Sequence, residues 1–104
     1  MLPLQERDSG HVYHLFVVRS PERDALQAHL RAAAIETLIH YPVPVSRQPA
    51  VAAAGPADCP VATRACDEVV SLPLHPALGV EHVDDVAAAI HALDGKGTGA
   101  PVPL

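Results

Sequence analysis

Apolar and polar residues alternate along this chain with two periods, one typical of β-strands and one typical of α-helices. The first apolar run covers residues 11–19, and its side chains divide between two faces, with Val12, His14, Phe16 and Val18 on one and Tyr13, Leu15 and Val17 on the other. Because both faces are mainly apolar, we expect this strand to be central in a sheet and covered on two sides. Residues 35–41 form a second, β-branched run that stops at Pro42, and residues 71–75 read as a short edge strand or extended segment.

Three further segments, residues 20–33, 60–70 and 80–93, repeat apolar residues at helical spacing. The first opens with a serine in the N-cap position and a proline in the first turn, and the second ends before two prolines that cannot continue a helix. The expected buried faces are Leu26, Leu30 and Ala33 in the first helix, Val61, Ala65 and Val69 in the second, and Val83, Val86, Ala87, Ile90 and Leu93 in the third.

Strands that alternate with helices in so short a chain predict one small domain. We expect an α/β two-layer sandwich (a small α+β fold), in which three helices lie on a small mixed sheet of about three strands. Residues 11–93 would form this domain, residues 1–10 a polar linker, and residues 94–104, which are rich in glycine and proline, a disordered tail.

Composition narrows the class of partner. Hydrophobic residues make up 49% of the 104 residues but aromatic residues only 3%, which predicts an aliphatic core and excludes a platform for stacking bases. The formal charge of −5 disfavours nucleic acids and anionic membranes. No stretch has the apolar length of a membrane helix and no leader pattern opens the chain, so we expect a cytoplasmic protein.

Histidines and cysteines do not form a recognisable metal or redox site. His11 and His14 are three residues apart on a predicted strand and therefore point to opposite faces. Cys59 and Cys66 lie along one predicted helix, about 10 Å apart and beyond the reach of a disulfide. We expect no bound metal and, because no base or nucleophile completes a reaction centre, no catalytic residue in this chain.

The best candidate for a binding site is the end of the second strand, where His40 and Tyr41 precede the rigid Pro42 loop. Such a pair either forms the lip of a pocket or is satisfied locally by backbone hydrogen bonds, and the residues alone leave both interpretations open. His14 alternates with Val12 and Phe16, a position that favours a hydrogen-bonded core histidine over a ligand.

Two motifs give these observations a family context. Residues 40–44 read His-Tyr-Pro-Val-Pro and residues 71–76 read Ser-Leu-Pro-Leu-His-Pro, with Gln48-Pro49-Ala50 and Pro60-Val61-Ala62 between them and an amphipathic helix after them. In this order, residues 11–93 resemble the C-terminal small domain of the DegT/DnrJ/EryC1/StrS sugar aminotransferases. That family consists of pyridoxal-phosphate (PLP) enzymes of the aspartate aminotransferase fold type (fold type I), which aminate ketosugars in deoxyaminosugar biosynthesis.

The resemblance implies a role without independent catalysis. It places His40, Tyr41, Pro42 and His14 at the cleft between two domains, near sugar or cofactor. The lysine that holds PLP belongs to the family's large domain, which would precede Met1, and the single lysine here, Lys96, lies in the glycine-rich tail. We therefore expect a domain that needs the large PLP-binding domain, in cis or in trans, and is inactive alone. The intact enzyme would bind PLP and a sugar substrate, and a homodimer is consistent with the resemblance.

Three positions depart from the family pattern. Ala34 stands where the family usually has glycine, which is tolerable if the local φ is negative; Ser46 replaces a histidine, and Thr63 replaces a glutamate. Together these departures suit either an outlying member of the family or a remnant that drifts without selection. A second interpretation is a stand-alone interaction module without catalysis, toward which Ser46 is a small hint. A detached domain should expose an apolar patch around Tyr13, Leu15 and residues 41–45, whereas an independent module should have a polar surface there.

Overall fold

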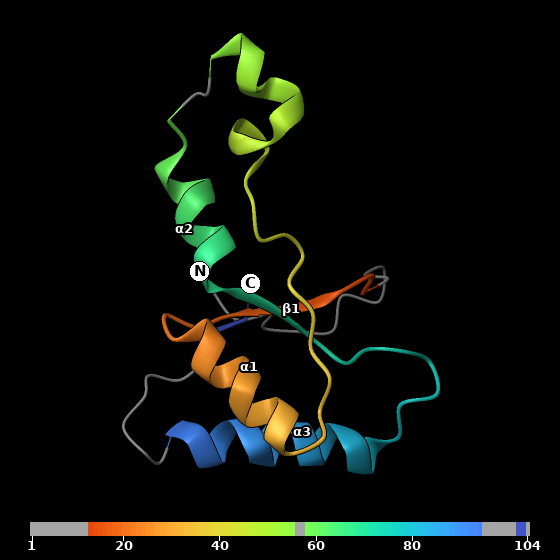
Figure 1. Ribbon diagram of the computed structural model, residues 1–104. Coiled ribbons are helices and arrows are strands. Elements are labelled where there is room, and N and C mark those ends of the chain that lie inside the picture. Colours follow the sequence, from red (N-terminus) through yellow and green to blue (C-terminus); the bar gives the residue numbers. More distant parts are fainter. Residues whose placement is uncertain (1–12, 56–57, 95–101, 104) are drawn as a thin grey trace.

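The computed structural model describes residues 13–55, 58–94 and 102–103 (Figure 1). The elements follow in the order β1 (Phe16–Arg19), α1 (Arg23–Ala32), the 3₁₀ turns η1 (Val45–Arg47) and η2 (Pro49–Ala54), α2 (Pro60–Glu68), β2 (Val69–Leu72), α3 (Val80–Asp94) and β3 (Val102–Pro103). Three helices and a small sheet form an α+β arrangement, as the sequence predicted. In the described residues no helix is long and apolar enough to cross a membrane.

The sheet has the order β2-β1-β3, so the first strand is central, as predicted. Phe16 pairs with Leu72 and Arg19 with Val69, and every pairing among the described residues is antiparallel, so the expectation of a mixed sheet is wrong there. β2 also begins two residues before the predicted segment 71–75. β3 falls within the predicted disordered tail; residues 95–101 and 104 lie outside the described residues, so disorder there stays a prediction.

Residues 35–41, predicted to form a strand, make a single bridge to the sheet, where Leu38 pairs with Ser71. The next hydrogen-bonded pair of this antiparallel ladder would join Glu36 to Pro73, which has no N–H to donate, and two further prolines follow at residues 42 and 44. On its other edge the segment is held by Gln27 of α1, which donates to the carbonyl oxygen of Thr37 at 3.3 Å and to its hydroxyl at 3.2 Å. It crosses the end of the sheet as an extended connection.

The core lies between one face of the sheet and helices α1 and α3, which lie on the same side of it (Figure 1). Its buried cluster consists of Val18, Leu26, Leu30 and Val70, with Phe16, Ile35, Leu72, Ala89, Ile90 and Leu93 packed against it. The prediction of cover on both sheet faces holds on one side only, since Leu15 and Val17 remain half-exposed. Likewise, Val83 and Ala87 of α3 are exposed, and Ala89 takes part in the packing in their place.

Helix α1 begins and ends with recognisable local chemistry. Ser20 does not cap it; its hydroxyl accepts the Glu22 N–H at 3.2 Å, which forms a turn one step before the helix. At the other end, the N–H of Ile35 donates to the Leu30 carbonyl and that of Ala34 to the Arg31 carbonyl, the pattern of a Schellman motif. Ala34 has φ +60°, so the condition under which alanine would be tolerated there is not met.

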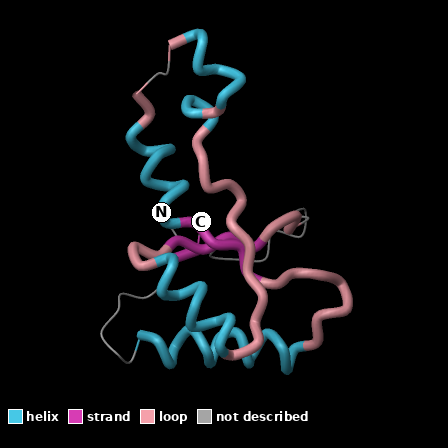
Figure 2. The backbone as a smooth tube through the Cα atoms, in the orientation of Figure 1, coloured by secondary structure: helices cyan, strands magenta, loops and turns pink. Residues whose placement is uncertain are grey.

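Residues 42–55 and 58–68, here called the arm, project away from the sheet and its two helices (Figure 1; Figure 2). No residue of α2 is buried, and its predicted core residue Val61 is 78% exposed. The radius of gyration is 15.5 Å, whereas a compact chain of this length has about 13 Å. The arm therefore finds little to pack against within its own chain.

Candidate functional site

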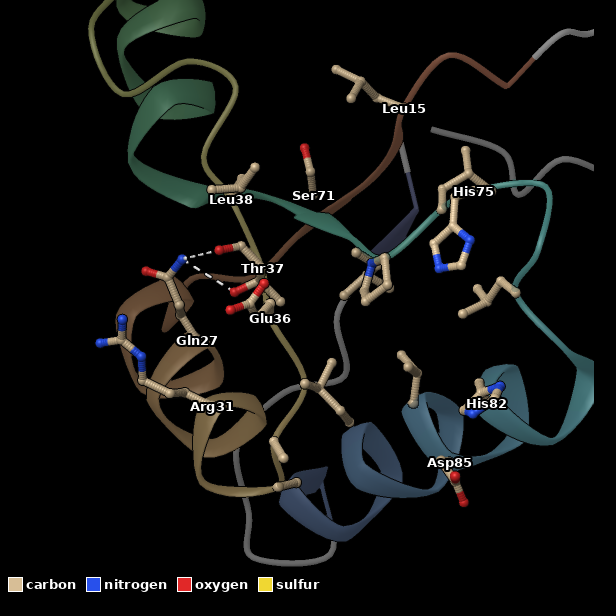
Figure 3. Close-up of a pocket in the computed structure, with 18 of the residues that line it drawn as sticks. Leu15, Gln27, Arg31, Glu36, Thr37, Leu38, Ser71, His75, His82 and Asp85 are labelled. Carbon is tan, nitrogen blue, oxygen red and sulfur yellow. Dashed lines mark hydrogen bonds between the residues drawn. The ribbon is translucent and has the colours of Figure 1, made fainter.

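An open groove of about 1350 Å³ runs between α1, the connection after it, the segment following β2, and α3 (Figure 3). Its lining mixes apolar side chains with polar ones. The polar residues are His14, Gln27, Arg31, Glu36, Thr37, His40, Ser71, His75, His82 and Asp85.

The structure places the four predicted site residues in two groups. His14 and His40 line the groove, whereas Tyr41 and Pro42 are exposed at the start of the arm and are not part of its lining. The rings of His40 and Tyr41 remain in edge-to-face contact, with centroids 5.5 Å apart. His14 is exposed, so the interpretation of it as a core histidine is wrong.

His40 is attached to the sheet through Ser71. Its Nδ1 lies 2.9 Å from the Ser71 hydroxyl, and the backbones of Leu38 and Ser71 exchange hydrogen bonds at 2.7 and 3.2 Å. These contacts join the two sequence motifs, residues 40–44 and 71–76, at one point. The interpretation in which His40 is satisfied only by the local backbone does not hold, because its partner is a side chain on another segment.

Several groove residues escaped the sequence analysis. Gln27, Arg31 and Asp85 occupy polar positions of predicted helices, which are solvent-facing in most helices and give no signal of their own. Ser71 and His75 could have been found, because they belong to the second motif and begin and end the segment 71–75 that was expected at the edge of the sheet.

A cluster of ion pairs lies outside the groove, where the end of the arm contacts β1. Glu68 accepts hydrogen bonds from Arg64 and Arg19, and these hold the pKa of its carboxyl below the usual 4.5 while raising that of Arg64. Arg23 donates to the carbonyl oxygens of Cys66 and Val69 at 3.1 and 3.2 Å. The base of the arm is thus fixed by ion pairs and side-chain to backbone bonds.

The residues present do not fit PLP without further protein. Imine formation needs a lysine at the site, and the described part of the chain contains none; Lys96 lies outside it. A metal site is not formed either, since no group of three His, Cys, Asp or Glu side chains converges in the residues described. Arg31, Gln27 and the histidines can contact the hydroxyl or anionic groups of a ligand, but they cannot supply the reacting amine.

Comparisons with known proteins show which family this chain resembles. The chain is 42% identical over 90 residues to the dTDP-3-amino-3,6-dideoxy-alpha-D-galactopyranose transaminase of Aneurinibacillus thermoaerophilus, which covers 86% of this chain and 25% of that protein. It is 49% identical over 93 residues to the erythromycin biosynthesis sensory transduction protein EryC1 of Saccharopolyspora erythraea, covering 88% and 25%.

Among solved structures, a DegT DnrJ EryC1 StrS aminotransferase from Brucella abortus superimposes with a TM-score of 0.66 at 27% identity, over 78% of this chain and 22% of that one. The chain therefore spans about a quarter of the length of the curated relatives it matches. Residues 1–91 match the model of the DegT/DnrJ/EryC1/StrS aminotransferase family. On these grounds the chain belongs to the DegT/DnrJ/EryC1/StrS aminotransferase family.

Proposed function

We propose that this chain is the C-terminal small domain of a PLP-dependent sugar aminotransferase and closes one side of its active-site cleft. It acts with a large domain, in cis or in trans, and does not transaminate alone. In the intact enzyme PLP supplies the electron sink for amino transfer, and the large domain supplies the lysine. The residues of this chain would contact the sugar and exclude water.

The observation that carries the proposal is the exposure of large apolar side chains in the arm and in the segment that leads into it, namely Leu38, Tyr41, Val43, Val45 and Val61. Tyr41 is 70% and Val45 77% exposed, although both follow the segment that carries His40. Soluble domains rarely leave such a run of apolar side chains to water unless another surface covers it.

The alternative, a stand-alone interaction module, predicts a polar surface at residues 41–45. Three of these five residues, Tyr41, Val43 and Val45, are exposed and apolar, while Tyr13 and Leu15 are half-buried. The exposed side chains therefore favour the domain of a larger enzyme over the independent module.

A chimeric enzyme tests the proposal. The matching quarter of the Aneurinibacillus thermoaerophilus transaminase is replaced by this chain, and turnover is followed with the aminosugar that names that enzyme. We expect turnover from the chimera, and none from this chain alone or from the transaminase with the quarter deleted. A chimera that folds and binds PLP but has no turnover would contradict the proposal.

A matched variant makes the test specific for the groove. His40→Ala in the chimera removes a groove-lining imidazole, whereas His91→Ala removes an exposed one on α3 that is not part of the groove lining. We expect turnover to fall with the first change and to remain with the second. Equal effects would show that the groove does not face the substrate.

A further inference from the structure

The contact between His40 and Ser71 bears on the protonation of the His40 ring as well as on its position. Leu38 and Ser71 exchange both backbone hydrogen bonds, and Ser71 is paired on its other side with Val17 of β1. The Ser71 backbone is therefore fixed from two sides. Its Cβ is therefore held in place, and only a change of the χ1 rotamer can carry its oxygen away from the imidazole.

Burial decides which atom carries the hydrogen. Ser71 is only 5% exposed, and in the described part of the chain its hydroxyl has one hydrogen-bond partner, Nδ1 of His40. If Nδ1 carried a hydrogen, the hydroxyl would accept it and its own hydrogen would be buried without an acceptor. If Nδ1 is bare, the hydroxyl donates to it, and only an oxygen lone pair stays unused, which is much less costly.

We propose that Ser71 is a positioning residue that donates to Nδ1 of His40 and so fixes the neutral imidazole as the Nε2–H tautomer. The free nitrogen of His40 is then a hydrogen-bond donor at the groove. Its partner would be an acceptor oxygen of the ligand, such as a hydroxyl, carbonyl or phosphate oxygen. The identity of that ligand rests on the proposed function, whereas the tautomer does not.

The position of Ser71 explains how the two sequence motifs act together. His40 is two residues beyond the bridge at Leu38, and the chain then turns away into the exposed Tyr41 and the arm. Without the serine hydroxyl, no other hydrogen bond within the described residues would hold this ring. Loss of Oγ should free the imidazole to rotate and to exchange tautomers.

Nuclear magnetic resonance of the full chain, labelled with ¹⁵N in its histidines, tests the tautomer directly. Nitrogen shifts distinguish a protonated from a bare ring nitrogen at a pH where the imidazole is neutral. We expect His40 to show a bare Nδ1 and a protonated Nε2 as a single form. The exposed His75, whose ring has no hydrogen-bond partner within the described residues, should show an average of both tautomers. A protonated Nδ1 at His40 would overturn the proposal.

Two variants separate positioning from stability. Ser71→Ala removes the hydroxyl, and we expect the His40 shifts to move toward the average seen for His75. Ser71→Thr keeps the hydroxyl and suits a strand, and should restore the single form. If Ser71→Ala folds and leaves the His40 shifts unchanged, the serine does not position the ring; if it does not fold, the wild-type shifts alone decide.

The chimera gives the functional readout. Ser71→Ala should lower kcat/KM by about tenfold, equivalent to ~1.4 kcal/mol, which is the upper part of the range for one neutral hydrogen bond. Ser71→Thr should recover most of that loss. If His40 is fixed as the Nε2–H tautomer but the chimera has no turnover, the proposed function is refuted and this inference stands. If the chimera is active but Nδ1 of His40 carries the hydrogen, this inference is refuted and the proposed function stands.

Discussion

Replacing Ala34 with glycine should stabilise this domain. Ala34 has φ +60° at the end of α1, held there by hydrogen bonds from its own N–H to Arg31 and from Ile35 to Leu30. An L-residue in this left-handed conformation costs about 1–2 kcal/mol, and glycine avoids that cost. Glycine also stabilises the unfolded chain by about 0.4–1 kcal/mol through its larger conformational entropy, which offsets part of this gain. The net increase in the free energy of unfolding should therefore be about 0.5–1 kcal/mol.

The alanine side chain contributes little that glycine would lose. Ala34 is exposed, so removal of its methyl group leaves no cavity in the core. The apolar contact that accompanies the motif, between Ile35 and Leu30, involves the neighbouring residues and stays intact. The relief of backbone strain at residue 34 therefore decides the sign of the change in stability.

Thermal and urea unfolding of the chain measure this gain, which corresponds to a rise in Tm of about 2–8 °C for a domain of this size. Ala28→Gly is the matched control, because Ala28 is also exposed but lies in the middle of α1, where the same change should cost about 1 kcal/mol. Opposite signs for the two substitutions support the reasoning. A destabilising Ala34→Gly, or equal effects at both positions, would refute it.

Three further predictions concern the core, the base of the arm and its surface. Val70→Ala, at a fully buried position, should cost about 2–3 kcal/mol in urea unfolding, whereas the same change at Val61, 78% exposed, should cost less than about 0.5 kcal/mol; similar losses would contradict the assigned core. Because the Glu68 pKa is depressed in the folded chain, its contribution to stability is present above about pH 4.5 and is lost as the pH falls through the lower, folded value. Glu68→Gln should therefore make Tm fall less steeply as the pH is lowered below 4.5. Glu36→Gln, at an exposed site without an ion pair in the described residues, should leave the pH dependence of Tm unchanged. Val45→Ser should change the unfolding free energy of the isolated chain by less than about 0.5 kcal/mol but lower the Tm of the chimera, and equal effects in both would argue against a covered surface.

Local rules predicted the parts of this fold that depend on local chemistry. The central strand, the three helices and the core residues Leu26 and Leu30 were found because apolar periodicity and proline positions determine them. The strand at residues 35–41 was wrong because its pairing with β2 stops after one bridge, where Pro73 has no N–H to donate to Glu36. The sequence shows this proline but not the segment that it would face.

The predicted buried faces were least accurate in α2 and α3. Val61 and Val83 have core-like spacing but are exposed. Periodicity reports that a face is apolar, not which surface covers it. Of the four predicted site residues, His14 and His40 line the groove and Tyr41 and Pro42 do not, and their role at a cleft between domains stays a prediction. Ser71 was recognised only as part of a motif, because its contact with His40 depends on a bridge between segments.

The central claim, that this chain completes a larger aminotransferase, is tested most directly by reading the transcript immediately upstream of the Met1 codon and the genes beside it. The account predicts a large domain with a PLP-binding lysine, either in frame with this segment or encoded next to it. A message that starts at Met1, with no such large domain beside it, would contradict the account.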